Sequence, residues 1–278
     1  MNISFLLECD ADSLSVMPAS GLFTVRPDIV LHLTGNDYEF LAWGDPISGD
    51  SFGKGLQSNP NPEYVVNNLS GNYCYLLADN NRGEITVGSS LFSILPVYYC
   101  VQNKRVTISG NVFDLGKHTG LKTVSASFVA ESLLFNYPLH NTSLIEGISL
   151  LPSNSALVVG AGGHRIIKHT AIETWFTDDP EPWRKSLSPM AETFLEAAGK
   201  YFPEEHYAAS LTGGFDGRTL VAAGLYHNRD FTCYCIGSEL SDDLLTAAHV
   251  AEGSGLKFIP VITDEKYALE QSLDFGLG

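Results

Sequence analysis

The sequence predicts an α+β domain built from antiparallel strands, followed by an α/β domain with a parallel sheet. Residues 1–170 contain short strand-like runs separated by turn clusters, with few helical stretches. An acidic, proline-containing segment at 177–182 is typical of a domain boundary. Beyond it, strand and helix patterns alternate as in βαβ units. Because 278 residues suffice for about two domains, we place them at 1–175 and 186–278.

Two hairpins are predicted in the first domain. Residues 70–77 and 84–88 have strand composition and flank the turn sequence Asp-Asn-Asn-Arg-Gly. Residues 97–101 and 105–109 flank a second short turn, Gln-Asn-Lys. A helix is predicted at 125–136, with Ser125 as its N-cap, because apolar residues recur there at helical spacing.

The second domain is predicted to open with a helix at 188–201, in which Ser188 is the cap and Pro189 the first helical residue. Three strand–helix pairs follow. They are 207–211 with 219–226, 231–236 with 243–252, and 257–262 with 265–273. Such alternation predicts a parallel sheet of three strands.

The charge balance argues against nucleic acid and membrane partners. The chain carries 16 Lys and Arg against 32 Asp and Glu, a formal net charge of −16, which repels phosphate backbones and anionic lipid. The acidic N-terminal residues do not resemble a secretory signal, and no apolar stretch is long enough for a bilayer. Five scattered cysteines do not suggest a disulfide framework, so we expect a cytoplasmic protein.

Cysteine and histidine spacing does not predict a metal site. Cys233 and Cys235 alternate on a predicted strand, which could bring two thiols to one metal ion. Packing of both residues against one face of the sheet is the favoured interpretation. His164 and His169 are the closest histidine pair that resembles ligands, and no cysteine lies near them.

The strongest chemical signal is a glycine-rich loop between a strand and a helix. The strand at 207–211 is followed by Thr-Gly-Gly-Phe-Asp-Gly-Arg at 212–218, and a helix then begins. Adjacent glycines allow backbone N–H groups to turn toward an anion, and the helix N-terminus favours negative charge. The P-loop and dinucleotide-binding patterns are absent. The loop therefore predicts a phosphate site, and a tight structural connection is the alternative.

The sequence Leu-Thr-Gly-Gly-Phe-Asp-Gly at 211–217 resembles the phosphate loop of the ATP-pyrophosphatase superfamily. The sequence around 233–251, with the acidic helix start Ser-Asp-Asp at 241–243, is similar to that of the asparagine synthetase family, which includes β-lactam synthetases and lasso-peptide cyclases. The segments at 69–73, 95–99 and 142–152 resemble its N-terminal amidotransferase-like domain, in order and spacing. The resemblance covers nearly the whole chain.

This resemblance implies an Ntn-hydrolase-like β-sandwich at 1–175, as a degenerate class II glutamine amidotransferase-like domain. It implies the N-terminal portion of an adenine nucleotide α-hydrolase-like domain at 186–278. The implied activity is ATP-dependent amide bond formation from a carboxylate and an amine, with ATP and Mg²⁺ as cofactors. The implied ATP and pyrophosphate-binding residues are Leu211, Thr212, Gly213, Gly214, Phe215, Asp216, Gly217, Arg218, Ile236 and Gly237.

Two of these residues have open roles. Asp216 is the implied Mg²⁺ ligand, although it could instead cap the following helix. Arg218 could bind a phosphate, or it could be a solvated side chain of the first turn. The phosphate interpretation also requires the backbone amides of Gly213 and Gly214 to point into a shared cavity, without protein acceptors of their own.

The chain departs from the family at three places. Position two is Asn2 instead of the catalytic cysteine, and Cys9 cannot replace a residue that must supply both thiol and α-amine. We therefore expect no glutamine hydrolysis and assign no catalytic residue. Gly217 stands where the family often has serine, and the second pyrophosphate motif is absent. An incomplete synthetase domain is expected.

Three interpretations follow from these departures. The first is an amide ligase of the asparagine synthetase type, with weak or no turnover. The second is a catalytically inactive scaffold that binds a partner protein. The third is one half of a split ligase, completed by a C-terminal partner chain, and a homo-oligomer is a further possibility.

Overall fold

The computed structural model describes residues 4–10, 18–92, 94–169, 183–264 and 267. The chain folds into two compact units, Met1–Phe176 and Thr177–Gly278, which we call the front unit and the back unit.

The front unit contains two antiparallel sheets, as expected for its strand-rich sequence. The five-stranded sheet has the order β2-β1-β8-β7-β9, and the six-stranded sheet has the order β11-β10-β6-β5-β4-β3. The strands of the first sheet are β1 (Leu6–Asp10), β2 (Phe23–Val25), β7 (Tyr98–Gln102), β8 (Arg105–Ser109) and β9 (Ser149–Leu150). Those of the second are β3 (Ile29–Thr34), β4 (Tyr38–Ser48), β5 (Leu69–Asp79), β6 (Glu84–Ser89), β10 (Ser155–Gly160) and β11 (Gly163–Lys168).

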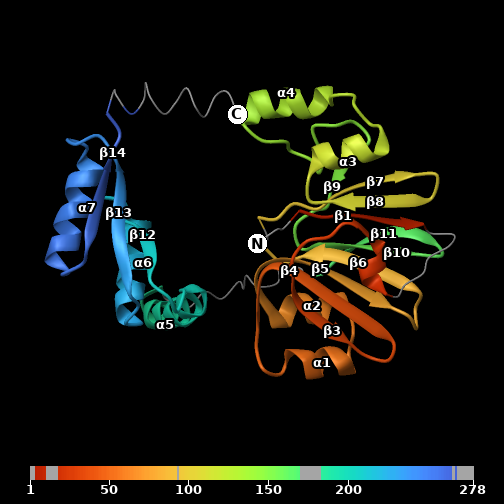
Figure 1. Cartoon of the computed structure of the whole chain (residues 1–278), viewed down its shortest axis with the longest axis horizontal. Coiled ribbons are helices and arrows are strands. Elements are labelled where there is room, and N and C mark those ends of the chain that lie inside the picture. Colours follow the sequence, from red (N-terminus) through yellow and green to blue (C-terminus); the bar gives the residue numbers. More distant parts are fainter. Residues whose placement is uncertain (1–3, 11–17, 93, 170–182, 265–266, 268–278) are drawn as a thin grey trace. The chain divides into compact units, whose positions relative to one another are not determined.

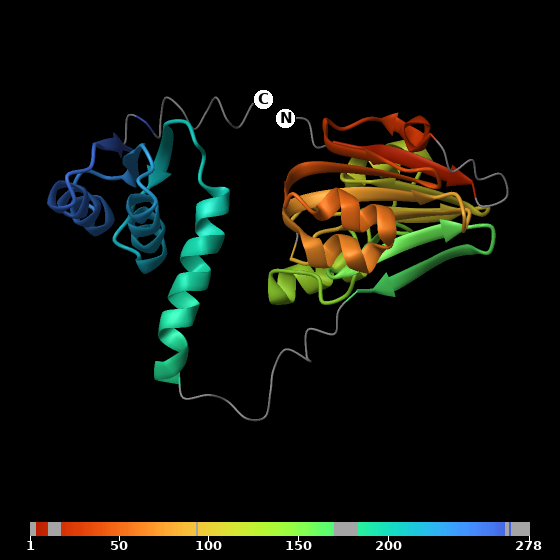
Figure 2. The ribbon, with the colours of Figure 1, turned by 90° about the horizontal axis from the view of Figure 1, so that it is seen from below.

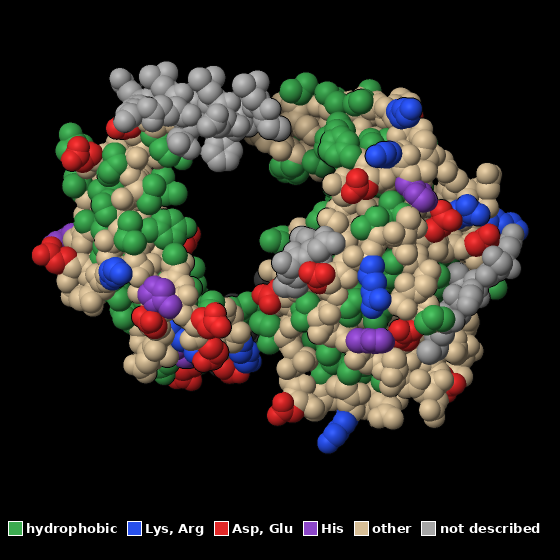
Figure 3. All heavy atoms as spheres, in the orientation of Figure 1, with side chains coloured by type: hydrophobic (Ala, Val, Ile, Leu, Met, Phe, Trp, Pro, Cys, Tyr) green, Lys and Arg blue, Asp and Glu red, His purple; other side chains and the backbone are tan. Residues whose placement is uncertain are grey.

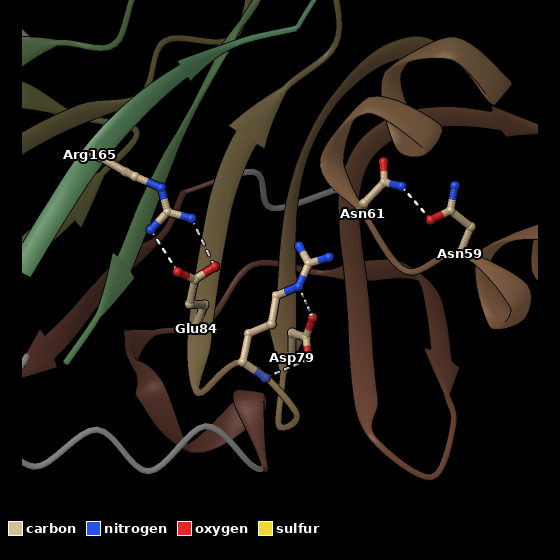
Figure 4. A network of polar contacts seen from close by, with 6 residues as sticks. Asn59, Asn61, Asp79, Glu84 and Arg165 are labelled. Carbon is tan, nitrogen blue, oxygen red and sulfur yellow. Dashed lines mark hydrogen bonds and ion pairs between the residues drawn. The ribbon is translucent and has the colours of Figure 1, made fainter. Parts of the chain in front are cut away.

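Both predicted hairpins are confirmed, since β5 pairs with β6 and β7 with β8. Polar contacts hold the first hairpin at its turn (Figure 4). Asp79 Oδ1 accepts a hydrogen bond from the Arg82 N–H at 3.1 Å. Arg165 of β11 forms a bidentate ion pair with Glu84, with N–O distances of 2.6 and 2.9 Å, and so joins two strands that both pair with β10. These contacts fix the ends of the strands.

Helices cover the outer faces of both sheets, which gives four layers (Figures 1 and 2). α1 (Phe52–Ser58) and α2 (Pro62–Asn68) pack against the six-stranded sheet, through a cluster that includes Phe40, Leu56 and Tyr75. α3 (Val112–Thr119) packs against the five-stranded sheet through Leu115. A third cluster, with Trp43, Leu76 and Ile108, fills the space between the sheets. The short 3₁₀ helix η1 (Ala19–Leu22) lies beside it.

The helix α4 (Ala126–Phe135) confirms the prediction for this segment, and Ser125 is its N-cap. The Ser125 hydroxyl accepts a hydrogen bond from the Phe128 N–H at 3.3 Å. None of its residues is buried, and Leu133 and Leu134 are 80% and 75% exposed. The helical spacing of the apolar residues therefore predicted the helix correctly, but two of those residues, Leu133 and Leu134, are exposed to solvent.

The back unit is an α/β layer, as predicted from the alternating pattern. Its strands β12 (Tyr207–Ser210), β13 (Phe231–Gly237) and β14 (Phe258–Ile262) form a parallel sheet in that order. α6 (Phe215–Tyr226) and α7 (Asp242–Gly253) contribute Val221 and Leu244 to the same core. Cys233 and Cys235 lie in this core as buried free thiols, which confirms the packing role favoured for them. The predicted helix at 265–273 lies almost wholly outside the described residues.

The opposite face of the three-stranded sheet is open among the described residues. Ile236 and Ile259 are 60% and 48% exposed there, whereas Cys233 and Cys235 on the helix side are buried. Apolar side chains also gather on the visible surface of the back unit in the space-filling view (Figure 3). The back unit therefore covers its sheet on one side, unlike the front unit.

The first helix of the back unit begins earlier than predicted. α5 spans Trp183–Tyr201, so Pro189 lies inside the helix and Ser188 is not its cap. A proline there removes one backbone hydrogen bond, which costs stability but does not end a helix when neighbouring turns continue. Within the described residues, no helix is long and apolar enough to cross a bilayer.

Candidate functional site

The candidate site lies at the carboxyl edge of the parallel sheet. Because β12, β13 and β14 are parallel, the connections that follow their carboxyl ends meet at this edge, where ligands of open α/β sheets bind. The loop 211–214 leads from β12 to α6, and 238–241 leads from β13 to α7. The Leu211 N–H donates to the Tyr234 carbonyl at 2.8 Å, which ties the first loop to β13.

The N-terminus of α6 has no side-chain cap. Its N-cap is Gly214, with φ −66° and ψ 154° and no capping hydrogen bond. By contrast, the Ser241 hydroxyl caps α7 by accepting from the Leu244 N–H at 3.4 Å. The first N–H groups of a helix need external acceptors, and the helix dipole favours an anionic one. The start of α6 therefore suits a phosphate oxygen.

The amides of the two glycines already have side-chain acceptors. The Gly213 N–H donates to Asp243 Oδ1 at 3.0 Å, and the Gly214 N–H donates to Thr212 Oγ1 at 3.1 Å. The expectation that both amides would be unoccupied is therefore wrong for this structure, and a phosphate oxygen could bind them only by displacing Asp243 Oδ1 and Thr212 Oγ1. The acceptor at Gly213 is nevertheless a carboxylate, so this position binds a negatively charged oxygen.

Asp243 is the residue that sequence analysis missed. It lies 30 positions beyond Gly213, in the first turn of α7. A side chain at position 213 would place its Cβ 2.9 Å from Asp243 Oδ1, so the contact depends on glycine. The pair of acids at 242–243 was visible in the sequence as an acidic helix start, but only the fold brings one of them to the loop.

The remaining loop residues differ in exposure and in their contacts. Asp216 is exposed in the first turn of α6. Arg218 Nε donates to the Gly214 carbonyl at 3.1 Å, which holds the guanidinium against the loop.

The apolar residues of the loop differ in burial. Phe215 is 75% exposed, whereas Leu211 is fully buried in the core of the back unit and anchors the loop there. A Cβ at Gly217 would meet only ordinary contacts, the nearest 3.4 Å away.

Ile236 and Gly237 lie at the carboxyl end of β13, at the same edge as the glycine loop. A Cβ at Gly237 would lie 2.8 Å from Ser241 Oγ, the atom that caps α7. Gly237 therefore makes room for that cap, and Ile236 projects from the open face of the sheet. Within the described ranges, no cluster of three or more His, Cys, Asp or Glu residues could hold a metal ion.

The thiols near the N-terminus of the front unit are unsuited to nucleophilic catalysis. Position two lies outside the described residues. Burial raises the pKa of both Cys9 and Cys74 to about 12, so these thiols stay protonated at neutral pH. A cavity of about 130 Å³ lies beside Phe5, Trp43 and Cys74. In the described part of the chain, the buried Trp43 Nε1 has no hydrogen-bond acceptor.

Comparisons with known proteins give little beyond this geometry. No family model matches the chain. A search of curated proteins gives no match either. One similar solved structure is the glutamine phosphoribosylpyrophosphate (PRPP) amidotransferase from B. subtilis complexed with ADP and GMP, at 8% identity and TM-score 0.27. Another is described as the allosteric regulatory enzyme of purine biosynthesis, at 8% identity and TM-score 0.31.

Each similarity covers 88% of this chain, but 52% of the first protein and 68% of the second. The chain thus spans about half the length of the PRPP amidotransferase. At this identity and TM-score, neither structure assigns a fold family, a function or a site to the chain.

Proposed function

We propose that the back unit binds the phosphates of ATP, with Mg²⁺, at the loop formed by residues 212–218. The observation that carries this proposal is the Gly213 amide, which holds a carboxylate oxygen at 3.0 Å beside a helix start that has no side-chain cap. Both features favour a negatively charged oxygen. Thr212, Gly214 and Arg218 contribute the remaining polar groups at the loop.

The proposed reaction class is ATP-dependent amide bond formation, as the resemblance to asparagine synthetases implies. In that reaction a substrate carboxylate attacks the α-phosphate, which gives an acyl-adenylate and releases pyrophosphate, and an amine then displaces AMP. The backbone amides of the loop and Arg218 would stabilise the charge that develops on the departing pyrophosphate. Asp216 would hold Mg²⁺, which neutralises phosphate charge when it is bound. The carboxylate and the amine are unspecified.

The front unit would not supply ammonia from glutamine. Asn2 lacks the thiol that this chemistry requires, and the thiols of Cys9 and Cys74 are buried and protonated. The amine would therefore enter as a separate substrate.

A charge reversal at the loop tests the nucleotide site. Gly214→Asp places a carboxylate where phosphate would bind, so we expect it to abolish the rise in melting temperature that millimolar Mg-ATP causes in the unmodified protein. Gly253→Asp is the matched control, because Gly253 lies at the end of α7 with no atom within 4 Å of its added Cβ. It changes the net charge equally. ATP–pyrophosphate exchange with candidate carboxylates then tests the ligase reaction.

Two results would contradict the proposal. One is the absence of any thermal response to Mg-ATP in the unmodified protein. The other is an equal response in both variants, which would move nucleotide binding away from the loop.

The open face of the sheet supports a second candidate function, the binding of a partner. Ile236 and Ile259 are exposed there, and β12 has no strand on its outer edge among the described residues. A polypeptide that adds a strand to this edge and a helix to this face would bury both isoleucines. Such a partner fits either a split ligase or an inactive scaffold. Protection of Ile236 from hydrogen exchange in a complex, with no effect of Gly214→Asp, would favour it.

A further inference from the structure

Three polar side chains at the amino edge of the parallel sheet form a hydrogen-bonded chain. His206 directly precedes β12, Asp230 directly precedes β13, and Thr232 is the second residue of β13. Asp230 Oδ2 lies 2.9 Å from His206 Nδ1, and Thr232 Oγ1 lies 3.1 Å from His206 Nε2. Parallel pairing of β12 with β13 brings His206 to Thr232, although the two are 26 positions apart. The imidazole thus bridges a carboxylate and a hydroxyl.

We propose that Thr232 is a nucleophile, activated by His206 and oriented through Asp230, and that the back unit hydrolyses esters of apolar carboxylic acids. A hydroxyl, an imidazole and a carboxylate in contact in this order are the arrangement of nucleophilic acyl transfer. That arrangement is recognised by geometry and roles, whatever the sequence positions. It is separate from the proposed nucleotide site, because Thr232 and Gly237 lie toward opposite ends of β13, about 16 Å apart along the strand.

The contact with Asp230 determines which imidazole nitrogen can act as the base. An ionised carboxylate only accepts hydrogen bonds, so the neutral ring keeps its proton on Nδ1, toward Asp230 Oδ2. His206 Nε2 is then left as the acceptor for the proton of the Thr232 hydroxyl. The negative charge of Asp230 also favours the imidazolium that forms when this proton is transferred. Asp230 is therefore a positioning residue, and His206 is the general base.

The residues beside Thr232 suit an acyl transfer site. Cys233 and Phe258 are register partners, and both pack on the helix side of the sheet. Because side chains alternate along a strand, Thr232 and Lys257, which precede them, belong to the opposite face. Lys257 supplies a positive charge on this face, where the tetrahedral intermediate of acyl transfer carries its negative oxygen. On the other side, the register partner of Thr232 is Ala208, whose small side chain leaves room for a substrate.

The open face of the sheet indicates the class of substrate. Tyr234 lies two residues beyond Thr232 on this face and is the register partner of Ile259, which is 48% exposed. An apolar acyl chain along these two side chains would be removed from water while its carbonyl carbon reaches the hydroxyl. The chain's net charge of −16 disfavours an anionic substrate. The site is therefore expected to take a neutral ester with an apolar acyl group.

The proposed reaction has two steps that share one base. Thr232 Oγ1 forms a bond to the ester carbonyl carbon while its proton passes to His206 Nε2. The bond from that carbon to the alcohol oxygen then breaks, and His206 returns the proton to the departing alcohol. Water attacks the acyl-threonine, with His206 again as the base, which releases the carboxylic acid and restores the Thr232 hydroxyl.

Acylation by p-nitrophenyl butyrate tests the nucleophile. Release of nitrophenolate gives the rate, and mass spectrometry of the digested protein locates the butyryl group, which we expect on the peptide that contains Thr232. Thr232→Val removes the hydroxyl and keeps a branched side chain that suits a strand, so it should lose this modification. Thr232→Ser keeps the hydroxyl and should retain the modification.

The two partners of the hydroxyl should contribute unequally. His206→Gln removes the general base and should slow acylation of Thr232 by about 100-fold or more. Asp230→Asn should slow it roughly two- to fivefold, because the Asp230 side chain is 81% exposed and exposed ion pairs are weak. His249→Gln is the matched control. His249 is an exposed histidine of α7, on the helix-covered side of the sheet, and its substitution should leave the rate unchanged.

Three results would overturn the inference. One is the absence of a butyryl group on Thr232 in the unmodified protein. Another is equal modification of Thr232→Val, which would assign the acyl group to a different nucleophile. The third is an unchanged rate in His206→Gln, which would leave the contacts of His206 a structural role alone. His206→Gln and Asp230→Asn change exposed side chains, so they keep the test decisive if Thr232→Val does not fold.

Discussion

The two units bury their sheets to different extents. In the front unit, the six-stranded sheet is covered on both faces, so neighbouring residues of β5 such as Tyr75 and Leu76 are both fully buried. In the back unit, the three-stranded sheet is covered on one face among the described residues. There Cys235 is 1% exposed and the next residue, Ile236, is 60% exposed.

This difference suggests that the buried front sheet contributes mainly to folding stability, whereas the less buried back unit is the one expected to bind a ligand. A sheet buried on both faces uses nearly every side chain for packing, and such residues contribute most of the hydrophobic free energy of folding. The back unit leaves an apolar face and a helix start without a side-chain cap accessible. Exposed groups are the ones that a ligand can reach, so binding is expected in the less buried unit.

Truncation of one side chain in each sheet should give the largest contrast. Leu76→Ala removes a fully buried side chain between the two front sheets, and we expect a loss of about 2–5 kcal/mol in the free energy of unfolding. Ile259→Ala acts on a residue that is 48% exposed and should cost no more than about 0.5–1 kcal/mol. Urea unfolding of both variants measures the difference. Equal costs would show that the open face is covered in solution.

Glycine substitution should give the next largest effect. Gly71 of β5 has a φ of +100°, and an added Cβ would overlap the carbonyl oxygen of Asp45. Gly71→Ala should therefore destabilise the front unit by about 1–3 kcal/mol. Gly214 has a φ of −66°, and its added Cβ would meet Thr212 Oγ1 at 3.1 Å.

Gly214→Ala should leave the free energy of unfolding within about 0.5–1 kcal/mol of the unmodified value while it weakens Mg-ATP binding. Thermal melting with and without Mg-ATP separates the two effects. A large loss of stability in Gly214→Ala would mean that the loop is mainly a structural connection.

Acid should affect the front unit through His169, with the smallest expected effect. Burial lowers the pKa of His169 from 6.5 to about 4, and its ring contacts the Tyr75 hydroxyl at 3.4 Å. Between these two values, the unfolded chain binds a proton that the folded protein does not. Stability therefore falls as the pH drops from 6.5 toward 4. Because the ring is partly exposed, we expect a loss of roughly 1–2 kcal/mol.

His169→Gln should remove this part of the pH dependence. The measurement is urea unfolding of the front unit at several pH values between 4 and 7, with the exposed His164→Gln as the control. A pH dependence that survives in His169→Gln would assign the acid sensitivity to other groups.

The sequence predicted the regular elements well where the signal was local. Turn residues located the hairpin between β5 and β6, and Ser125 marked the start of α4, because turn and cap chemistry depends on a few consecutive residues. The start of α5 was wrong, since Pro189 was taken as its first residue and lies inside it. Proline is favoured at the first position of a helix, but at Pro189 the helix already extends back to Trp183. The spacing of apolar residues in α4 also did not predict that its leucines would be exposed to solvent.

For the candidate site, the sequence by itself determined the glycine loop, its place between a strand and a helix, and the acidic start of α7. These features follow from short-range patterns. The tertiary structure alone decided that Asp243 meets the Gly213 amide, that Leu211 is buried and that Ile236 is exposed. Contacts between residues 30 positions apart depend on how βα units pack side by side, and a linear pattern contains no measure of that geometry.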